Sequence, residues 1–270
     1  MPVAEPRNAI YNFMKQLLTI IIGLFCTATV YADCAGSGLS VFPSGQTIKQ
    51  NSIFVIDGYA ESQYVILGLN KKHDIYLKSG NKKIKLLVTE ICVGQFYLTQ
   101  AILKPETGLE AGLEYTMYID NLPNDEHFGN NNSTTHKYKL VSYKVVAEKD
   151  TEKPQLTSRP KELNKTFAYY GCGPSTYVIF SNPAKDKSDI IVKTTVKSLK
   201  TGKTTSYYIQ PDSNKIKVGH GMCSGAFDFD ESNNYEVEFS FMDSCGNLSI
   251  WTGERIKFTK PTKETSHNDE

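Results

Sequence analysis

The densest group of residues that could do chemistry is the segment Gly219-His220-Gly221-Met222-Cys223. Imidazole, thioether and thiolate groups are borderline to soft ligands of the kind that Cu(I) takes, so His220 and Met222 are candidate metal ligands. A glycine-rich loop closed by an oxidised Cys223 explains the same residues, and it is the interpretation we favour. The glycines miss the G-x-G-x-x-G spacing by one residue, which argues against a phosphate-binding loop. We therefore expect no metal and no other cofactor.

Oxygen ligands gather a few residues later, where Asp228 and Asp230 stand in the segment 228–234. Calcium accepts carboxylates and carbonyls, but the EF-hand spacing with its Gly and terminal Glu is absent. We interpret the segment as a solvated turn before a strand that begins at Tyr235, with a calcium site as the alternative.

Motifs of the common hydrolases are missing: neither G-x-S-x-G nor H-E-x-x-H occurs. The sequence therefore predicts a protein that is not an enzyme. Long polar loops in compact domains are often functional, which makes the loop 121–135 the expected contact surface. Its candidate contact residues are Asn124, Asp125, His127, Asn130 and Asn131.

The N-terminal segment has the pattern of a secretory signal peptide. Lys15 precedes an uncharged apolar run from Leu17 to Val30, and the triplet that ends at Ala32 is an acceptable cleavage site. The run is shorter than the roughly 20 residues of a spanning helix, so we expect no transmembrane span in the mature chain. We predict a signal peptide over residues 1–32, cleavage after Ala32, and export to the periplasm or beyond. Met14 is the more natural initiator, and a retained membrane anchor is the alternative.

Cleavage would also remove the excess charge. The 270 residues include 30 basic and 29 acidic ones, for a net charge of +1. The predicted leader contains Arg7, Lys15 and Glu5, so the mature chain is neutral. A neutral chain without a basic stripe offers no general attraction for nucleic acid or anionic lipid. The expected partner is a protein or a glycan.

The cysteines of an exported protein favour disulfides over reactive thiols or zinc sites. After cleavage two remain in the first half and three in the second. The simplest pairing joins Cys34 to Cys92 and makes one bridge among Cys172, Cys223 and Cys245.

Short runs of β-branched and aromatic residues, separated by turn residues, predict an all-β chain. In the first half the expected strands are 52–57, 63–69, 74–78, 84–91, 96–103, 113–120 and 137–146. In the second half they are 167–170, 175–181, 190–198, 204–210, 215–218, 235–242 and 250–258. Hairpin turns are expected at 78–81 and 200–203, where Gly80 and Gly202 supply conformational freedom. The charged segment 147–160 is expected to be a linker.

Three segments resemble bacterial immunoglobulin-like domains. The first is the opening segment Phe42-Pro43-Ser44-Gly45, which is followed by a run of β-forming residues. The second is Leu103-Lys104-Pro105 with Leu109, Gly112 and Tyr115, which is similar to their "L-x-P…L-x-x-G-x-x-Y" element. The third, Asp243-Ser244-Cys245-Gly246-Asn247, is similar to the "D-x-x-G-N" turn between their last two strands.

This resemblance implies two tandem immunoglobulin-like β-sandwich domains, at 33–147 and 148–260. The polar composition of residues 261–270 separately predicts a disordered tail. In such a sandwich Cys172 and Cys223 lie at the same end, so their pairing is expected and Cys245 is left as a free thiol. A bridge from Cys172 to Cys245 is the alternative. The implied function is an exported, non-catalytic binding or structural protein of the bacterial cell envelope, acting in recognition, adhesion or spacing. A periplasmic metal-handling protein of the copper type is the alternative.

Overall fold

The structure is a computed structural model that describes residues 36–124, 126, 128–132, 137–229 and 232–264. The predicted leader lies outside these residues, as do Cys34, Asp125, His127 and Asp230. Residues Ala35–Glu270 belong to one compact unit. No helix within the described ranges is long and apolar enough to cross a membrane.

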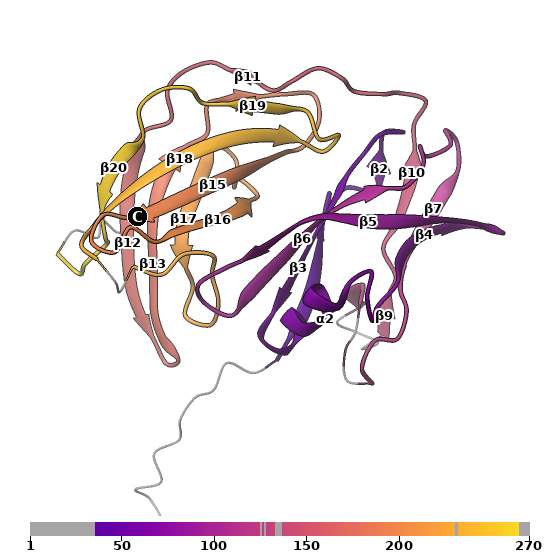
Figure 1. Cartoon of the computed structure of the whole chain (residues 1–270), viewed down its shortest axis with the longest axis horizontal. Coiled ribbons are helices and arrows are strands. Elements are labelled where there is room, and N and C mark those ends of the chain that lie inside the picture. Colours follow the sequence, from indigo (N-terminus) through magenta and orange to yellow (C-terminus); the bar gives the residue numbers. More distant parts are fainter. Residues whose placement is uncertain (1–35, 125, 127, 133–136, 230–231, 265–270) are drawn as a thin grey trace, which may run out of the picture. The chain divides into compact units, whose positions relative to one another are not determined.

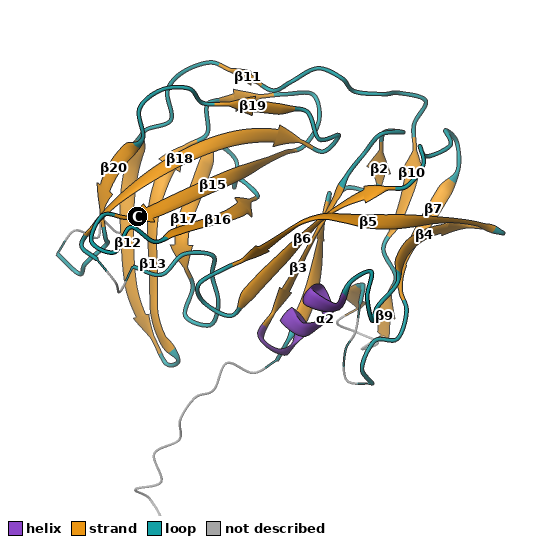
Figure 2. Ribbon diagram, viewed as in Figure 1, coloured by secondary structure: helices purple, strands orange, loops and turns teal. Residues whose placement is uncertain are grey.

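Strands make up most of the regular structure (Figures 1 and 2). In the first half they are β1 (Gly38–Phe42), β2 (Thr47–Ile48), β3 (Phe54–Tyr59), β4 (Ile75–Ser79), β5 (Lys82–Val93), β6 (Leu98–Pro105), β7 (Glu114–Ile119), β8 (Asn130–Asn132), β9 (Lys137–Lys139) and β10 (Ser142–Val145). All but β8 and β9 follow one hydrogen-bonded path, β1-β3-β6-β5-β4-β7-β10-β2, and β8 pairs with β9.

The long strand β5 lets this path enclose a core. Its N-terminal end pairs with β4 and its C-terminal end with β6, and the register shifts between Val88 and Glu90. Such a bulge bends a strand and increases its twist. Side chains from β3, β4, β6, β7 and β10 consequently meet in one hydrophobic cluster, which contains the fully buried Phe54, Leu77 and Tyr115.

The segment predicted as a strand over 63–69 is instead the helix α2 (Gln63–Gly68), preceded by the 3₁₀ turn η1 (Ala60–Ser62). Val65, Ile66 and Leu69 are buried while Tyr64 and Leu67 are exposed. Buried positions three and four residues apart are the period of a helix, not of a strand. The β-branched and aromatic residue types were a weaker signal than this spacing.

In the second half the strands are β11 (Gln155–Leu156), β12 (Glu162–Tyr170), β13 (Gly173–Ser181), β14 (Ala184–Lys185), β15 (Ile190–Ser198), β16 (Thr204–Ile209), β17 (Lys215–His220), β18 (Asn234–Asp243), β19 (Leu248–Ile250) and β20 (Ile256–Thr259). One sheet has the order β12-β13-β17, and a second has β16-β15-β18 with β19 and β20 both paired to β18. Two predicted strands are each divided: 137–146 contains β9 and β10, and 250–258 contains the end of β19 and β20. The hairpin turns at Gly80 and Gly202 are confirmed, each glycine having a positive φ.

The two halves share buried contacts. The second hydrophobic cluster is centred on Phe180, Phe239 and Phe241, and it also includes Ile53 and Ile102 of the first half. The all-β fold is thus confirmed, whereas the division into two immunoglobulin-like domains stays a prediction.

A polar network also joins the halves where β3 and β6 meet β16. Tyr207 donates a hydrogen bond of 2.5 Å to the carboxylate of Asp57, and Gln100 Nε2 donates one of 2.8 Å to the same oxygen. The Gln100 side chain also exchanges two hydrogen bonds with the backbone of Tyr208. Burial raises the pKa of Asp57 to about 6, against the lowering effect of its two donors.

Candidate functional site

The inner face of the sheet β12-β13-β17 changes from apolar to polar toward one end. Successive inward pairs across β13 and β17 are Phe180 with Ile216, Val178 with Val218, and then Thr176 with His220. The first two pairs belong to the hydrophobic core. On β12, Phe167 is the register partner of Thr176. Directly opposed residues of an antiparallel pair point to the same face, so Phe167, Thr176 and His220 form one row.

This row lies along a cavity of about 420 Å³. We call it the end cavity. Its apolar walls come from Phe96, Phe167, Pro174 and Phe229, and Thr176 and His220 add polar atoms. Asp228, Lys260 and Lys263 also line it. This volume lies within the range of small-molecule pockets.

The hydroxyl of Thr176 has no hydrogen-bond partner although the residue is only 7% exposed. Among the described residues, the indole N–H of Trp251 is the only other buried side-chain polar group without a hydrogen-bond partner. Leaving a buried polar group unpaired costs about 1–3 kcal/mol. The Thr176 hydroxyl is therefore the kind of group that a ligand would satisfy.

His220 presents a defined acceptor. Its Nδ1 lies 2.8 Å from the carbonyl oxygen of Gly221. A carbonyl can only accept, so Nδ1 is the donor in this contact, and in that tautomer Nε2 has the lone pair. His220 as a residue is 8% exposed, and Phe96 packs edge-on against its ring with ring centroids 5.1 Å apart. The ring is fixed in both orientation and tautomer.

Glycines allow the close backbone approach that places His220 and Phe96. A Cβ on Gly219, whose φ is +150°, would lie 2.0 Å from the carbonyl oxygen of Thr176. A Cβ on Gly225 would lie 2.2 Å from that of His220, and the Gly225 backbone exchanges hydrogen bonds with Phe96. The segment 219–223, singled out for its candidate ligands, is therefore part of a glycine-dependent loop that lines the end cavity.

The candidate soft ligands His220 and Met222 both line the end cavity, together with Asp228 and the thiol of Cys172. Of the candidate contact residues, Asn124 is exposed in a turn, whereas Asn130 and Asn131 lie in β8.

The predicted disulfide pairings are not formed. Cys92, Cys172 and Cys245 are free, so Cys92 is not joined to Cys34 and Cys172 is not joined to Cys223. Cys92 lies in β5 beside Glu90, and Cys245 lies beside Ser52. Cys223 is bonded in a disulfide, but not to any of these three. The alternative bridge from Cys172 to Cys245 is not formed either.

A second candidate is an acidic cluster that the sequence did not indicate. Asp150, Asp186 and Asp243 bring their carboxylate oxygens within 4.8 Å of one another. The ammonium of Lys49, however, already lies against this group, 2.7 Å from Asp150 Oδ2. Ser188 donates a further hydrogen bond to the same oxygen. Hydrogen bonding to Lys49 and Ser188 holds the pKa of Asp150 at about 2.

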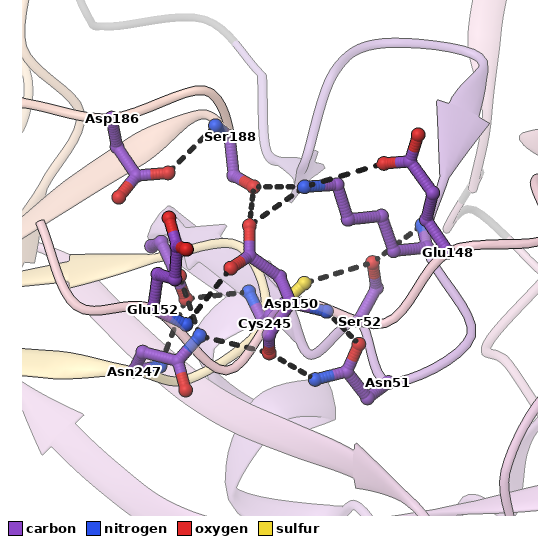
Figure 3. Close-up of polar contacts among 11 residues, drawn as sticks. Asn51, Ser52, Glu148, Asp150, Glu152, Asp186, Ser188, Cys245 and Asn247 are labelled. Carbon is purple, nitrogen blue, oxygen red and sulfur yellow. Dashed lines mark hydrogen bonds and ion pairs between the residues drawn. The ribbon is translucent and has the colours of Figure 1, made fainter.

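The main chain of Asp150 ties the expected linker to both halves (Figure 3). Its N–H donates to Asn51 Oδ1, and its carbonyl accepts from Asn51 Nδ2 and Asn247 Nδ2. Asn247 closes the predicted turn, in which Asp243 Oδ1 accepts the N–H groups of Cys245 and Asn247. The acidic cluster is therefore a polar junction with its own cation, and the end cavity remains the better ligand site.

Comparisons with known proteins leave the ligand open. No family model matches the chain, and no curated protein does. Among solved structures, a pullulanase from Anoxybacillus sp. complexed with maltotriose aligns at 10% identity and a TM-score of 0.24, over 77% of this chain and 24% of that one. A type I pullulanase from Bacillus subtilis complexed with maltose aligns at 10% identity and a TM-score of 0.24, over 85% of this chain and 29% of that one. CBD12 from CALX1.2 aligns at 7% identity and a TM-score of 0.20, over 76% of this chain and 81% of that one. The chain thus spans under a third of either pullulanase, and alignments this distant say nothing about ligand or activity.

Proposed function

We propose that this chain is an exported, non-catalytic binding protein of the bacterial cell envelope, and that its ligand site is the end cavity. The observation that carries the proposal is the buried, unpartnered hydroxyl of Thr176 at a cavity of small-molecule size. Apolar walls with a few polar groups between them are the usual composition of a ligand pocket. The leader-like segment at 1–32 supports export.

A binding role fits the polar groups better than catalysis does. Nucleophilic catalysis needs a nucleophile hydrogen-bonded to a base that a third group orients, commonly a carboxylate. His220 is oriented by the Gly221 carbonyl, and the Thr176 hydroxyl has no bond to it. The thiol of Cys172 lines the cavity without forming a hydrogen bond with the imidazole.

Alkylation of Cys172 offers a direct measure of cavity occupancy. Cys172 is partly exposed, whereas Cys92 and Cys245 are buried and serve as internal controls. Burial also raises the pKa of both buried thiols, which slows their reaction further. The mature chain would be treated with iodoacetamide in the presence of a library of uncharged, fragment-sized compounds. Compounds that slow alkylation of Cys172 and raise the melting temperature support the proposal, and a library without any such compound refutes it.

A soft metal ion is the second candidate, because Cys172, His220 and Met222 line the same cavity. The test is competition with a colorimetric Cu(I) chelator, followed by metal analysis of the chain. One Cu(I) per chain that is lost in both Cys172→Ser and His220→Gln would favour metal handling. Absence of stoichiometric copper would remove this candidate and leave the first one standing.

A further inference from the structure

The polar atoms of the end cavity select the chemistry of its ligand, if the proposed function holds. His220 Nε2 is an acceptor, because Nδ1 holds the ring proton against the Gly221 carbonyl. A ligand atom beside Nε2 must therefore donate. Carboxylates and phosphodiesters are ionised at neutral pH and have no proton to donate, so neither fits this position.

The neighbouring Thr176 hydroxyl adds the second requirement. Thr176 and His220 are register partners, so their side chains are adjacent on one face of the sheet. The Thr176 proton has no acceptor in the structure. One ligand atom that both donates to Nε2 and accepts from Thr176 would satisfy both groups. A hydroxyl oxygen does so, whereas an ammonium can only donate.

The other residues that line the end cavity favour a ligand with an uncharged ring. Phe96, Phe167 and Phe229 supply apolar surface, and a ring with C–H groups on its faces can pack against it. Asp228 brings negative charge to the lining while Lys260 and Lys263 bring positive charge, so charges of both signs are present. These groups offer both acceptors and donors to further hydroxyls, which a ligand with one hydroxyl would not use.

We infer that the end cavity binds a neutral sugar residue of a glycan, with one sugar hydroxyl bridging Thr176 Oγ1 and His220 Nε2. The three phenylalanines pack against the ring, and the charged side chains contact the outer hydroxyls. This inference deepens the proposed function, since it names the ligand class of the same site.

The test measures binding of a panel of neutral methyl glycosides and trisaccharides of glucose, galactose, mannose and xylose to the mature chain by calorimetry and saturation-transfer NMR. Phenol and cyclohexanol, with one hydroxyl each, are the control probes. At least one sugar is expected to bind and to protect Cys172 from alkylation. Thr176→Val, which keeps the shape of the side chain, is expected to weaken that binding at least tenfold, as expected for a lost buried hydrogen bond.

The matched control is Thr194→Val in β15, a buried threonine outside the cavity whose hydroxyl donates to the Val192 carbonyl. This variant should bind the sugar as the wild type does. Thr176→Val removes an unpaired hydroxyl, so it should fold at least as stably as the wild type.

Three results would overturn the inference. Protection of Cys172 by phenol or cyclohexanol, with no sugar bound, would leave the end cavity a ligand site but not a sugar site. Sugar binding that Thr176→Val leaves unchanged would place the sugar elsewhere. If neither the sugars nor the fragment library protect Cys172, the proposed function fails along with the inference.

Discussion

Asp57 lies at the contact between β3 and β16, and replacing it by asparagine is expected to stabilise the protein above pH 7. The pKa of this carboxyl is about 6 in the folded protein, against an ordinary value of 3.8. The folded state therefore holds the proton more tightly than the unfolded state does. This contribution to stability is complete below pH 4 and is lost as the pH rises through 6.

The size of the effect follows from the shift. About two pKa units at 1.36 kcal/mol each correspond to about 3 kcal/mol, which is an upper limit because Asp57 is only partly buried. Asp57→Asn has no charge to desolvate. Its amide oxygen can still accept from both Gln100 and Tyr207, which donate to one and the same oxygen of Asp57, so the network is kept. We expect the variant to match the wild type near pH 4 and to exceed it by up to about 3 kcal/mol at pH 7.5.

Urea denaturation of both proteins at half-unit steps from pH 4 to pH 8 measures this difference. Other carboxyls titrate in both proteins and cancel in the difference between the two curves. Glu61→Gln, which changes an exposed carboxylate, is the control and should follow the wild-type curve. Parallel curves for Asp57→Asn and the wild type would refute the reasoning, because they would mean that Asp57 has the same pKa in the folded and unfolded states.

Two further predictions concern the polar junction and the glycine loop. Asp150→Ala should lower the free energy of unfolding by about 2–4 kcal/mol in chemical denaturation, because the partly buried Lys49 ammonium loses its closest acceptor. Glu148→Ala, 3.8 Å from the same ammonium and exposed, should change it by less than about 0.5 kcal/mol. Gly219→Ala should cost more than about 3 kcal/mol or abolish soluble expression, because its Cβ would overlap a carbonyl of β13. Gly202→Ala, with a positive φ but open space around it, should cost about 1 kcal/mol in the same assay.

Local signals in the sequence predicted much of the fold. The turns at Gly80 and Gly202 depend on a few adjacent residues, and the strands beside them follow from runs such as 190–198. Helix α2 was missed because residue type and spacing disagree there, and spacing decided the structure. The contacts made by segment 147–160 could not be predicted from neighbouring residues either. It has few apolar residues, but Asp150 is held through polar groups that come from distant parts of the chain.

The end cavity shows why a site can escape sequence reasoning even when one of its segments is noticed. Segment 219–223 was singled out for ligands that stand next to each other in the chain, yet His220 acts beside Thr176, which is distant in sequence and adjacent only through strand register. The signal that the sequence offered was a change of residue type along two paired strands. The inward-facing residues of β13 and β17 are apolar up to the pair Val178 and Val218, and the next inward-facing pair is polar. A buried hydroxyl without a partner weakens a core that is otherwise well packed. A ligand that satisfies Thr176 would remove that cost, and we therefore expect bound ligand to stabilise the mature chain and Thr176→Val to abolish most of that stabilisation.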